Sequence, residues 1–363
     1  MFIVSPKWLY LGNKKLDHKK SLLIDGTLIA DILSDTQIEK KYGRLKKVTF
    51  DNHVLMPTLC ESYLNIDDCE NQNDYSNKLN SMLKQGVTNI QINSKDHKKY
   101  INHERDHGFN ITYMITLDGS KKVDNDIKDM IKLLDFYKSD SSKHFSVNLN
   151  KILHFDKKIL EKISSICNEL NLNINIHMND FSKTTDSEAK EFFKFWDVIN
   201  LLNNCSLQGF NSIKLQKHKY FNKKNITLLI DYSELNDIEN IKLFLSLLKQ
   251  KYKCVLVTNR ENHYRFYDIL NFMSFFTNSS DLFNPNGLID CVTSNASRFF
   301  SQIEGSSIIK KGGLASFNIF NLQSNTLLEK ERDNVSLIDI DNKSLTNVWS
   351  FGKRLYTSNE YDK

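Results

Sequence analysis

The feature that most constrains the fold is an alternation of strand and helix patterns that begins at Leu59 and repeats eight times. Short apolar runs that alternate with amphipathic segments are typical of β/α units around a parallel sheet. The expected strands are residues 59–65, 87–92, 110–117, 144–148, 173–177, 205–210, 226–231 and 254–258. The expected helices are residues 76–85, 99–107, 125–138, 156–170, 187–202, 213–221, 237–250 and 264–276. Eight such units predict an α/β protein with a (β/α)8 TIM barrel, whose chemistry lies at the carboxyl ends of the strands.

Both ends of the chain carry strand patterns without this alternation. Strand patterns fill residues 1–56, where Asp25-Gly26 marks a hairpin turn, and they return after a helix expected over 288–302. The expected flanking strands are residues 2–4, 8–11, 21–24, 28–33, 47–50, 54–56, 307–309, 314–320, 335–338 and 347–350. We infer that the two ends form one composite β-sandwich, so that its parts are 1–56 and 305–363 and the barrel is 57–304.

Composition disfavours several classes of protein. The 363 residues hold no apolar run near the roughly 18 residues of a membrane span, and the N-terminal segment lacks a leader pattern, so we expect a cytoplasmic protein with no membrane partner. Six cysteines without a C-x-x-C pair disfavour a zinc knuckle and a disulfide framework. The net charge of +5 is spread over many amphipathic segments, which disfavours a nucleic-acid partner.

Polar residues occupy one face of the first expected barrel strand. Strand alternation separates a row of Glu61, Tyr63, Asn65 and Asp67 from a row of Cys60, Ser62, Leu64 and Ile66. A barrel enzyme would hold a metal or a substrate with such a polar row, yet this row contains no histidine.

Several motifs, in order along nearly the whole chain, resemble those of the amidohydrolase superfamily, in its cytosine deaminase, chlorohydrolase and aminofutalosine deaminase branch. D-G-T-L-I-A-D-I-L at 25–33 is similar to the family's first hairpin, and L-M-P-T-L at 55–59 to the entry of its first barrel strand. The other matching segments are K-Q-G-V-T-N-I at 84–90, the helix and strand of 157–180, T-S-N-A-S-R-F-F at 293–300, residues 304–320 and V-W-S-F-G-K-R-L at 348–355. This resemblance also implies a barrel inserted into a β-sandwich.

The resemblance implies hydrolysis or deamination by a metal-bound water, which needs at least three protein ligands. The family takes these from an H-x-H pair on the first strand, a histidine on the fifth, often one on the sixth, and an aspartate after the eighth. Here the H-x-H positions are Tyr63 and Asn65, the fifth-strand histidine is kept as His177, and the sixth-strand position is Gln208. Most of the ligand set has therefore changed.

Two further positions complete the comparison. The family's proton-transferring glutamate, three residues after the fifth-strand histidine, is Asp180 here, and the final aspartate is Asn259. Arg260 follows it and is a candidate for binding an anion. The resemblance thus gives His177 and Asp180 as a residual acid/base pair. The candidate substrate-binding residues are Tyr63, Asn65, Gln208, Asn259 and Arg260.

These substitutions predict an amidohydrolase-like protein that has lost metal-dependent hydrolase activity and binds a ligand or regulates a partner, without a cofactor. If a metal is bound, we expect weak zinc or iron near His177. One alternative is an active hydrolase or deaminase acting on C–N bonds of a cyclic nitrogenous substrate, and another is an oligomeric scaffold without a ligand. A small nitrogenous ligand and a homodimer are the expected partners.

Overall fold

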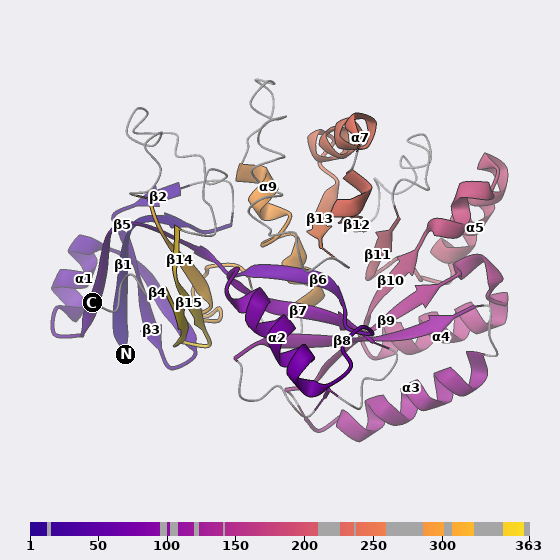
Figure 1. The fold of residues 1–363 in the computed structure, drawn as a ribbon, viewed down its shortest axis with the longest axis horizontal. Helices are drawn as coiled ribbons and strands as arrows, with labels where there is room; N and C mark the ends of the chain where they lie inside the picture. The colour runs from indigo at the N-terminus through magenta and orange to yellow at the C-terminus, as the bar shows by residue number, and fades with distance from the viewer. Residues whose placement is uncertain are drawn as a thin grey trace.

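A parallel sheet of eight strands forms the centre of the molecule. The computed structural model describes residues 1–12, 16–94, 100–101, 108–119, 123–140, 142–209, 226–235, 237–258, 286–300, 307–322 and 344–358. The central strands are β6 (Leu59–Asn65), β7 (Val87–Asn93), β8 (Asn110–Asp118), β9 (His144–Asn150), β10 (Asn173–His177), β11 (Cys205–Gln208), β12 (Thr227–Asp231) and β13 (Lys253–Val257). They pair in chain order, and β13 lies next to β6, so the sheet closes into the predicted (β/α)8 barrel (Figure 1). We call the carboxyl ends of these strands the barrel mouth.

The helices lie on the outer side of the barrel (Figure 1). They are α2 (Gln72–Leu83), α3 (Val123–Tyr137), α4 (Lys157–Glu169), α5 (Asp186–Val198) and α7 (Ile238–Lys249). Their apolar faces follow the helical period: α4, for example, buries Leu160, Ile163 and Cys167. These side chains join outward-facing strand residues such as Val147 and Ile174 in the largest apolar cluster. Every second strand residue therefore packs against the helices, and the residues between them face the barrel interior.

The interior contains an apolar part. Met114 of β8, Leu229 of β12 and Val257 of β13 pack in one cluster with Phe299 and Phe300 of the short 3-10 helix η7 (Ala296–Phe300). Because β8 is not a neighbour of β12 or β13 in the sheet, this cluster lies across the inside of the barrel. No described helix is long and apolar enough to cross a membrane.

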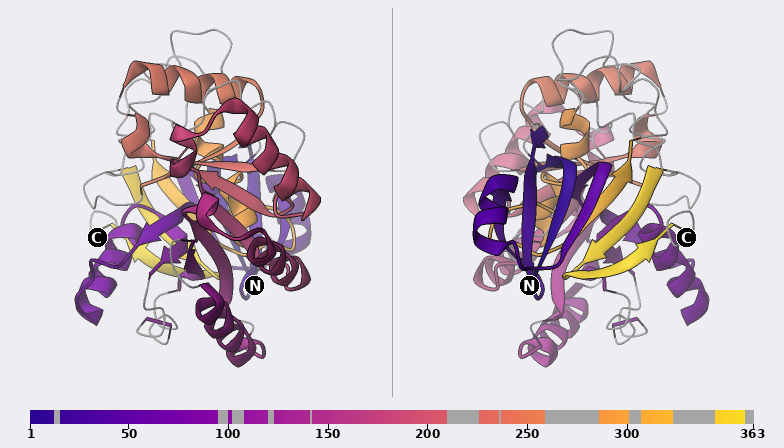
Figure 2. Two further views of the ribbon diagram at one scale, coloured as in Figure 1. Left: turned by 90° about the vertical axis from the view of Figure 1, so that its right-hand side faces the viewer. Right: turned by 90° about the vertical axis from the view of Figure 1, so that its left-hand side faces the viewer.

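A second sheet joins the two ends of the chain. Its strands are β1 (Phe2–Tyr10), β2 (Leu16–His18), β3 (Lys20–Asp25), β4 (Leu28–Ser34), β5 (Lys47–Pro57), β14 (Phe317–Asn321), β15 (Leu345–Ser350) and β16 (Lys353–Thr357). The order is β16-β15-β14-β5-β1-β3-β4, with β2 added to β1, so N- and C-terminal strands meet at β5 and β14 (Figure 2). Ile29 at the β4 edge also exchanges backbone hydrogen bonds with Gly312 and Gly313. The sheet therefore curls around a shared core, as the predicted composite β-sandwich requires.

Several local predictions are corrected. The expected strand pairs 2–4 with 8–11 and 47–50 with 54–56 are the single strands β1 and β5, and residues 35–42 form an unpredicted helix, α1 (Asp35–Tyr42), with a Ser34/Gln37 capping box. The expected helix 288–302 ends after α9 (Asn286–Asp290), because the Asp290 carbonyl turns back to accept from Asn295 N–H. The strand expected over 307–309 is absent, because Ser307 has a φ of +59°, which lies outside the β region. The helices expected at 213–221 and 264–276, and most of that at 99–107, lie outside the described residues.

Gly86 joins the curled sheet to the barrel. Its carbonyl oxygen accepts from Leu59 N–H at 2.9 Å, where β6 begins, and from Asn318 Nδ2 of β14 at 2.9 Å. Its φ is +79°, and a Cβ there would lie 2.3 Å from Asn318 Nδ2. The turn before β7 therefore needs glycine for both its conformation and its contact with Asn318.

Gly312 provides a matched comparison, since its φ of +77° is almost the same and nothing lies within 4 Å of a Cβ built there. Replacing Gly312 with alanine should cost roughly 1–2 kcal/mol of unfolding free energy from the left-handed backbone alone. We expect Gly86→Ala to cost about 1 kcal/mol more, because it also displaces the buried Asn318 hydrogen bond. Urea unfolding of both variants measures the difference; equal losses would show that the contact with Asn318 does not matter for stability.

Candidate functional site

Four of the candidate residues lie at or near the barrel mouth. Asn65, His177 and Gln208 are the last residues of β6, β10 and β11, and Tyr63 lies two positions before the end of β6. His177 and Gln208 are direct partners in the parallel pairing of β10 with β11. Of the other three candidates, Asp180 lies in the turn after β10, and Asn259 and Arg260 lie outside the described residues.

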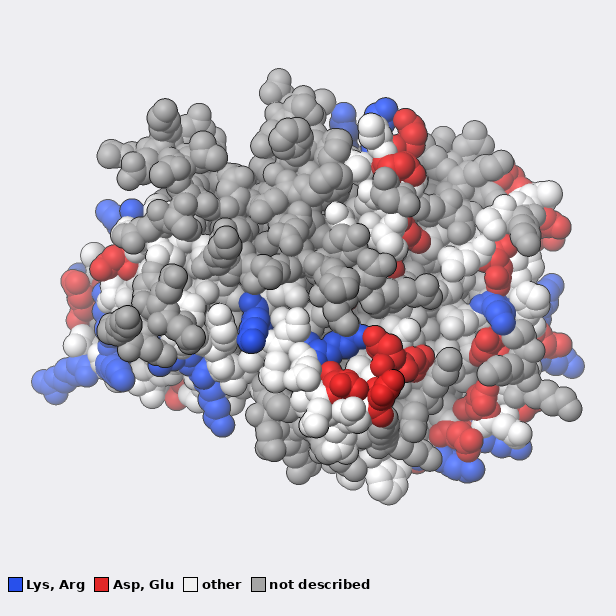
Figure 3. Space-filling model, viewed as in Figure 1, with Lys and Arg blue, Asp and Glu red and all other residues white. Residues whose placement is uncertain are grey.

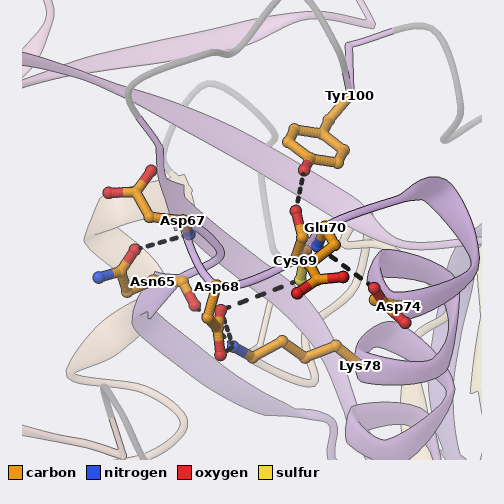
Figure 4. Close-up of polar contacts among 8 residues, drawn as sticks. All are labelled: Asn65, Asp67, Asp68, Cys69, Glu70, Asp74, Lys78 and Tyr100. Atoms are coloured by element: carbon orange, nitrogen blue, oxygen red, sulfur yellow. Dashed lines mark hydrogen bonds and ion pairs between the residues drawn. The ribbon is translucent and has the colours of Figure 1, made fainter.

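The oxygen atoms of Asn65 are used within its own loop (Figure 4). Its side-chain Oδ1 accepts from Asp67 N–H at 3.0 Å, and its backbone carbonyl accepts from Lys78 Nζ at 2.8 Å. An asparagine that bonds the backbone two residues ahead forms an Asx turn. The side-chain oxygen that would have to bind a metal therefore shapes the turn after β6.

A buried lysine stabilises this loop from the side of α2. Lys78 is 8% exposed and binds the Asp68 carboxylate at 2.9 and 3.2 Å as well as the Asn65 carbonyl. The Tyr100 hydroxyl donates to the Cys69 carbonyl at 2.9 Å, which fixes the next part of the loop (Figure 4). Acidic side chains gather on this face of the molecule (Figure 3). The loop is thus held in place by Lys78 of α2 and by Tyr100.

Tyr63 occupies the space beside His177. The two rings meet edge to face with centroids 5.5 Å apart. The Tyr63 side chain is 5% exposed and belongs to the apolar cluster inside the barrel. A phenol ring therefore lies next to the one retained histidine, where the resemblance would place an imidazole.

Asp180 lies in the turn that follows β10. This 3-10 turn, η4 (Asn179–Lys183), is close to the end of β11, because Met178 N–H donates to the Gln208 carbonyl at 2.8 Å. Gly209, with φ of +84°, allows the approach: a Cβ there would lie 2.3 Å from Asn179 Oδ1. The Oδ2 atom of Asp180 is buried and has no hydrogen-bond partner among the described residues.

Side-chain amides and hydroxyls fill the interior below the mouth from β7 to β11. Thr116 Oγ1 donates to Asn93 Oδ1 at 2.6 Å, and Asn148 Nδ2 donates to Thr116 Oγ1 at 3.1 Å. Asn175 Nδ2 continues the series, to Asn148 Oδ1 at 2.8 Å and to Gln208 Oε1 at 3.2 Å. These residues, with Ser206 bonded to Asn175 Oδ1 at 2.9 Å, form what we call the amide network. Every member is an uncharged group.

A buried carboxylate connects the first and last strands of the barrel. Glu61 is fully buried; its Oε2 accepts from Thr258 N–H at 3.0 Å and from Thr258 Oγ1 at 2.5 Å, and its Oε1 accepts from Tyr63 N–H at 3.0 Å. The segment after α9 also bridges this boundary, since Val292 and Cys291 carbonyls accept from Cys60 and Leu256 N–H groups. The pKa of Glu61 is raised to about 7, chiefly by burial; the hydrogen bonds from Thr258 and Tyr63 oppose this rise, and the nearby charge of Asp231 adds to it.

The expected two rows of β6 are partly wrong. The register of β6 against β7 shifts between Glu61 and Leu64, so Cys60 packs inside the barrel with Tyr63, whereas Leu64 and Ile66 face the helices. A β-bulge of this kind changes which residues share a face.

Sequence reasoning missed the amide network, although a signal exists. Asn89, Gln91 and Asn93 alternate along β7, and Asn148 and Asn175 hold inward positions on β9 and β10. A period of two in amide residues marks the inner face of a strand. Polar rows on strands other than the first would have predicted an uncharged interior.

The donor set does not fit the divalent metal that the resemblance implies. Structural and catalytic zinc sites take imidazole, thiolate or carboxylate ligands. The described mouth supplies one imidazole, His177, while the Asn65 and Gln208 side-chain oxygens are bonded to protein N–H groups. Among the described residues no group of three His, Cys, Asp or Glu side chains is placed to hold a metal ion.

The raised pKa of Glu61 makes a testable contribution to stability. A carboxyl whose pKa is higher in the folded than in the unfolded protein binds its proton more tightly when folded, so the free energy of unfolding falls as pH rises from 4.5, the usual value, to about 7. The Glu61→Gln variant lacks this titration, and we expect wild type to lose about 3 kcal/mol relative to it across that range. Urea unfolding at several pH values measures the difference.

Glu39→Gln, the same change on an exposed face of α1, is the control for loss of one carboxylate. A stability difference between wild type and Glu61→Gln that stays constant from about pH 4.5 to 7.5 would contradict a raised pKa.

No family model matches the chain, and no curated protein matches it in sequence. Solved structures do match its fold. An adenosine deaminase from Xanthomonas campestris with bound zinc is 12% identical, with a TM-score of 0.76 over 97% of this chain and 92% of that one. The aminofutalosine deaminase of Helicobacter pylori, in complex with methylthio-coformycin, is 12% identical, with a TM-score of 0.75 over 98% of this chain and 100% of that one.

A variant of atrazine chlorohydrolase from Arthrobacter aurescens, in complex with zinc and atraton, gives a TM-score of 0.74 at 11% identity, over 98% of this chain and 95% of that one. These identities are too low to transfer an activity, and the overlap in each case includes both the barrel and the curled sheet. The chain therefore has the amidohydrolase fold, a (β/α)8 barrel with a composite β-sandwich, as the order of its motifs predicts.

Proposed function

We propose that this protein binds a small nitrogenous ligand at the barrel mouth and has lost the metal-dependent hydrolase activity that the amidohydrolase resemblance implies. The observation that carries the proposal is the chemistry of the mouth. Tyr63 and Gln208 stand at two ligand positions, and the third, Asn65, has its oxygen bonded to Asp67. Such a mouth suits hydrogen bonding to a ligand better than coordination of a cation.

A polar site without a metal is consistent with ligand recognition. Binding pockets commonly combine apolar and aromatic walls with a few fixed polar groups. Here Tyr63 and His177 supply ring surfaces, and the amide network fixes the polar groups because its members bond to one another. A preorganised site loses less conformational entropy on binding. A sensing or regulatory role is the function that this arrangement supports best.

An active hydrolase acting on C–N bonds is the second candidate. The observation that favours it is Asp180, whose buried Oδ2 has no hydrogen-bond partner among the described residues and which lies three residues after His177. In that case His177 and Asp180 would move protons during hydrolysis. The homodimer, the scaffold role and the cytoplasmic location stay predictions.

Metal content separates the two functions. We expect purified protein to contain far less than one equivalent of zinc, iron or manganese per chain, and His177→Ala to leave that content unchanged. Elemental analysis of the protein after dialysis measures it. About one equivalent of metal, lost in His177→Ala, would overturn the proposed function.

The matched control restores imidazoles to the mouth. Tyr63→His with Asn65→His, together with His177, provides three nitrogen ligands, which is the number that catalytic zinc sites use. We expect this double variant to bind more zinc than wild type, and His177→Ala in the same background to remove the gain. That result would show that the analysis detects a metal at this position when its ligands exist.

A further inference from the structure

The boundary between the first and last strands of the barrel has no backbone ladder. β6 and β13 are neighbours, but no backbone hydrogen bond of the described residues joins one directly to the other. β12 and β13, by comparison, pair over five residues, and β8 and β9 over seven. Two consecutive carbonyls stand between β6 and β13: Val292 accepts from Cys60 N–H at 2.8 Å, and Cys291 accepts from Leu256 N–H at 3.2 Å. We call residues 291–292 the wedge.

The wedge is held more firmly by β13 than by β6. Besides the bond from Leu256, the segment is tied to β13 by Asn295 Nδ2, which donates to the Cys254 carbonyl at 3.0 Å. On the β6 side, Cys60 N–H provides the backbone bond, and the Cys60 thiol points to the Thr293 carbonyl at 4.0 Å. A thiol is a weak donor, so the second contact adds little. The boundary between β6 and the wedge is therefore the weaker of the two.

Nearer the mouth, one side chain takes over this connection. The Glu61 carboxylate accepts from Thr258 N–H and Oγ1 with one oxygen and from Tyr63 N–H with the other. The hydrogen bonds that the described residues show between β6 and the end of β13 thus all end on Glu61. Because this side chain is fully buried, water does not compete for these bonds.

The ladder on the other side of β6 is interrupted at the same level. The register against β7 shifts between Glu61 and Leu64, so that Ser62 and Tyr63 lie opposite the single residue Gln91. A bulge of this kind leaves its extra residue out of the ladder. Residues 62–63 therefore have an interrupted ladder on one side and a carboxylate in place of a ladder on the other.

From this geometry we infer that Glu61 is a latch, whose release lets the barrel open locally between β6 and the wedge while the other strands stay paired. Segments with few ladder hydrogen bonds open at a lower free energy than the core of a protein. The Tyr63 ring lies edge to face against His177, so movement of β6 uncovers that histidine at the mouth. The latch does not depend on the proposed function, because it operates without a ligand.

Amide hydrogen exchange of the wild-type protein, followed by NMR spectroscopy at several low urea concentrations, tests the local opening. We expect the N–H groups of Tyr63 and Thr258 to exchange at least about tenfold faster than those of β8 and β9. Their rates should barely change with urea, since a local opening exposes little surface. Equal rates with the same urea dependence would overturn the inference, because all these groups would then exchange by global unfolding.

The Glu61→Gln variant tests the latch itself at about pH 8, where the wild-type carboxylate is mostly ionised. Whichever way the glutamine amide turns, its NH2 group faces a donor, Thr258 N–H or Tyr63 N–H. We expect exchange of both N–H groups to accelerate by about tenfold or more. Gly312→Ala is the control: it lowers global stability from the curled sheet and should leave these two rates unchanged.

No acceleration in Glu61→Gln, or an equal acceleration in Gly312→Ala, would contradict the latch. Should Glu61→Gln fail to fold in circular dichroism, Thr258→Val makes the same test, because it removes the hydroxyl bond to Glu61 and keeps the shape of the side chain. We expect Thr258→Val to accelerate Tyr63 exchange by several-fold.

Discussion

The hydrogen bonds between neutral amide side chains inside the barrel are the interaction on which this account of the protein depends. Asn148 and Asn175 each donate and accept within the network, so each is held by neighbours on both sides. Leaving one such buried group unpaired costs about 1–3 kcal/mol, which keeps the members of the network together. Polar residues can therefore fill the interior without an ion to organise them. In a metalloenzyme with this fold, charged and imidazole groups around the metal would do so.

Hydrogen bonds to shared oxygen acceptors also join the parts of the fold. The Glu61 carboxylate takes N–H groups from both edges where the barrel closes, and the Gly86 carbonyl takes them from β6 and from Asn318 of the curled sheet. At each junction, one carboxylate or carbonyl group accepts hydrogen bonds from two different segments of the chain. A change at either junction should therefore affect the strand ends that shape the mouth, as well as global stability.

Periodicity predicted the barrel because the outer faces of its strands and helices repeat faithfully. Cys167 and Ile174, for example, were in amphipathic patterns and lie in the helix-facing core. The broken segment after α9 was missed because it is held by a contact that is distant in sequence: Asn295 Nδ2 donates to the Cys254 carbonyl of β13, 41 positions away. The partner of Glu61, Thr258, is 197 positions away along the chain, which no local pattern can relate.

The sequence predicted three positions of the candidate site: the retained His177 and the changed Tyr63 and Asn65. It did not predict the contacts that these side chains make. The contact of Tyr63 with His177 and the bond from Asp67 to Asn65 arise from the folded geometry. The alternating amides of β7 are visible in the sequence, but their hydrogen-bond partners are not. Thr116 and Asn148, which donate to Asn93, come from other strands. The amide network is a property of neighbouring strands, so it becomes visible only after the strands are paired.

The central claim is that Tyr63, Asn65 and Gln208 stand at the mouth in place of the metal ligands that the resemblance implies. Anomalous X-ray scattering at the zinc absorption edge, from crystals of the wild-type protein grown with excess zinc, tests it most directly. We expect no anomalous peak within coordination distance of His177, about 2.0–2.1 Å from its ring nitrogens. A fully occupied zinc ion bound by His177 and at least two further protein ligands would contradict it.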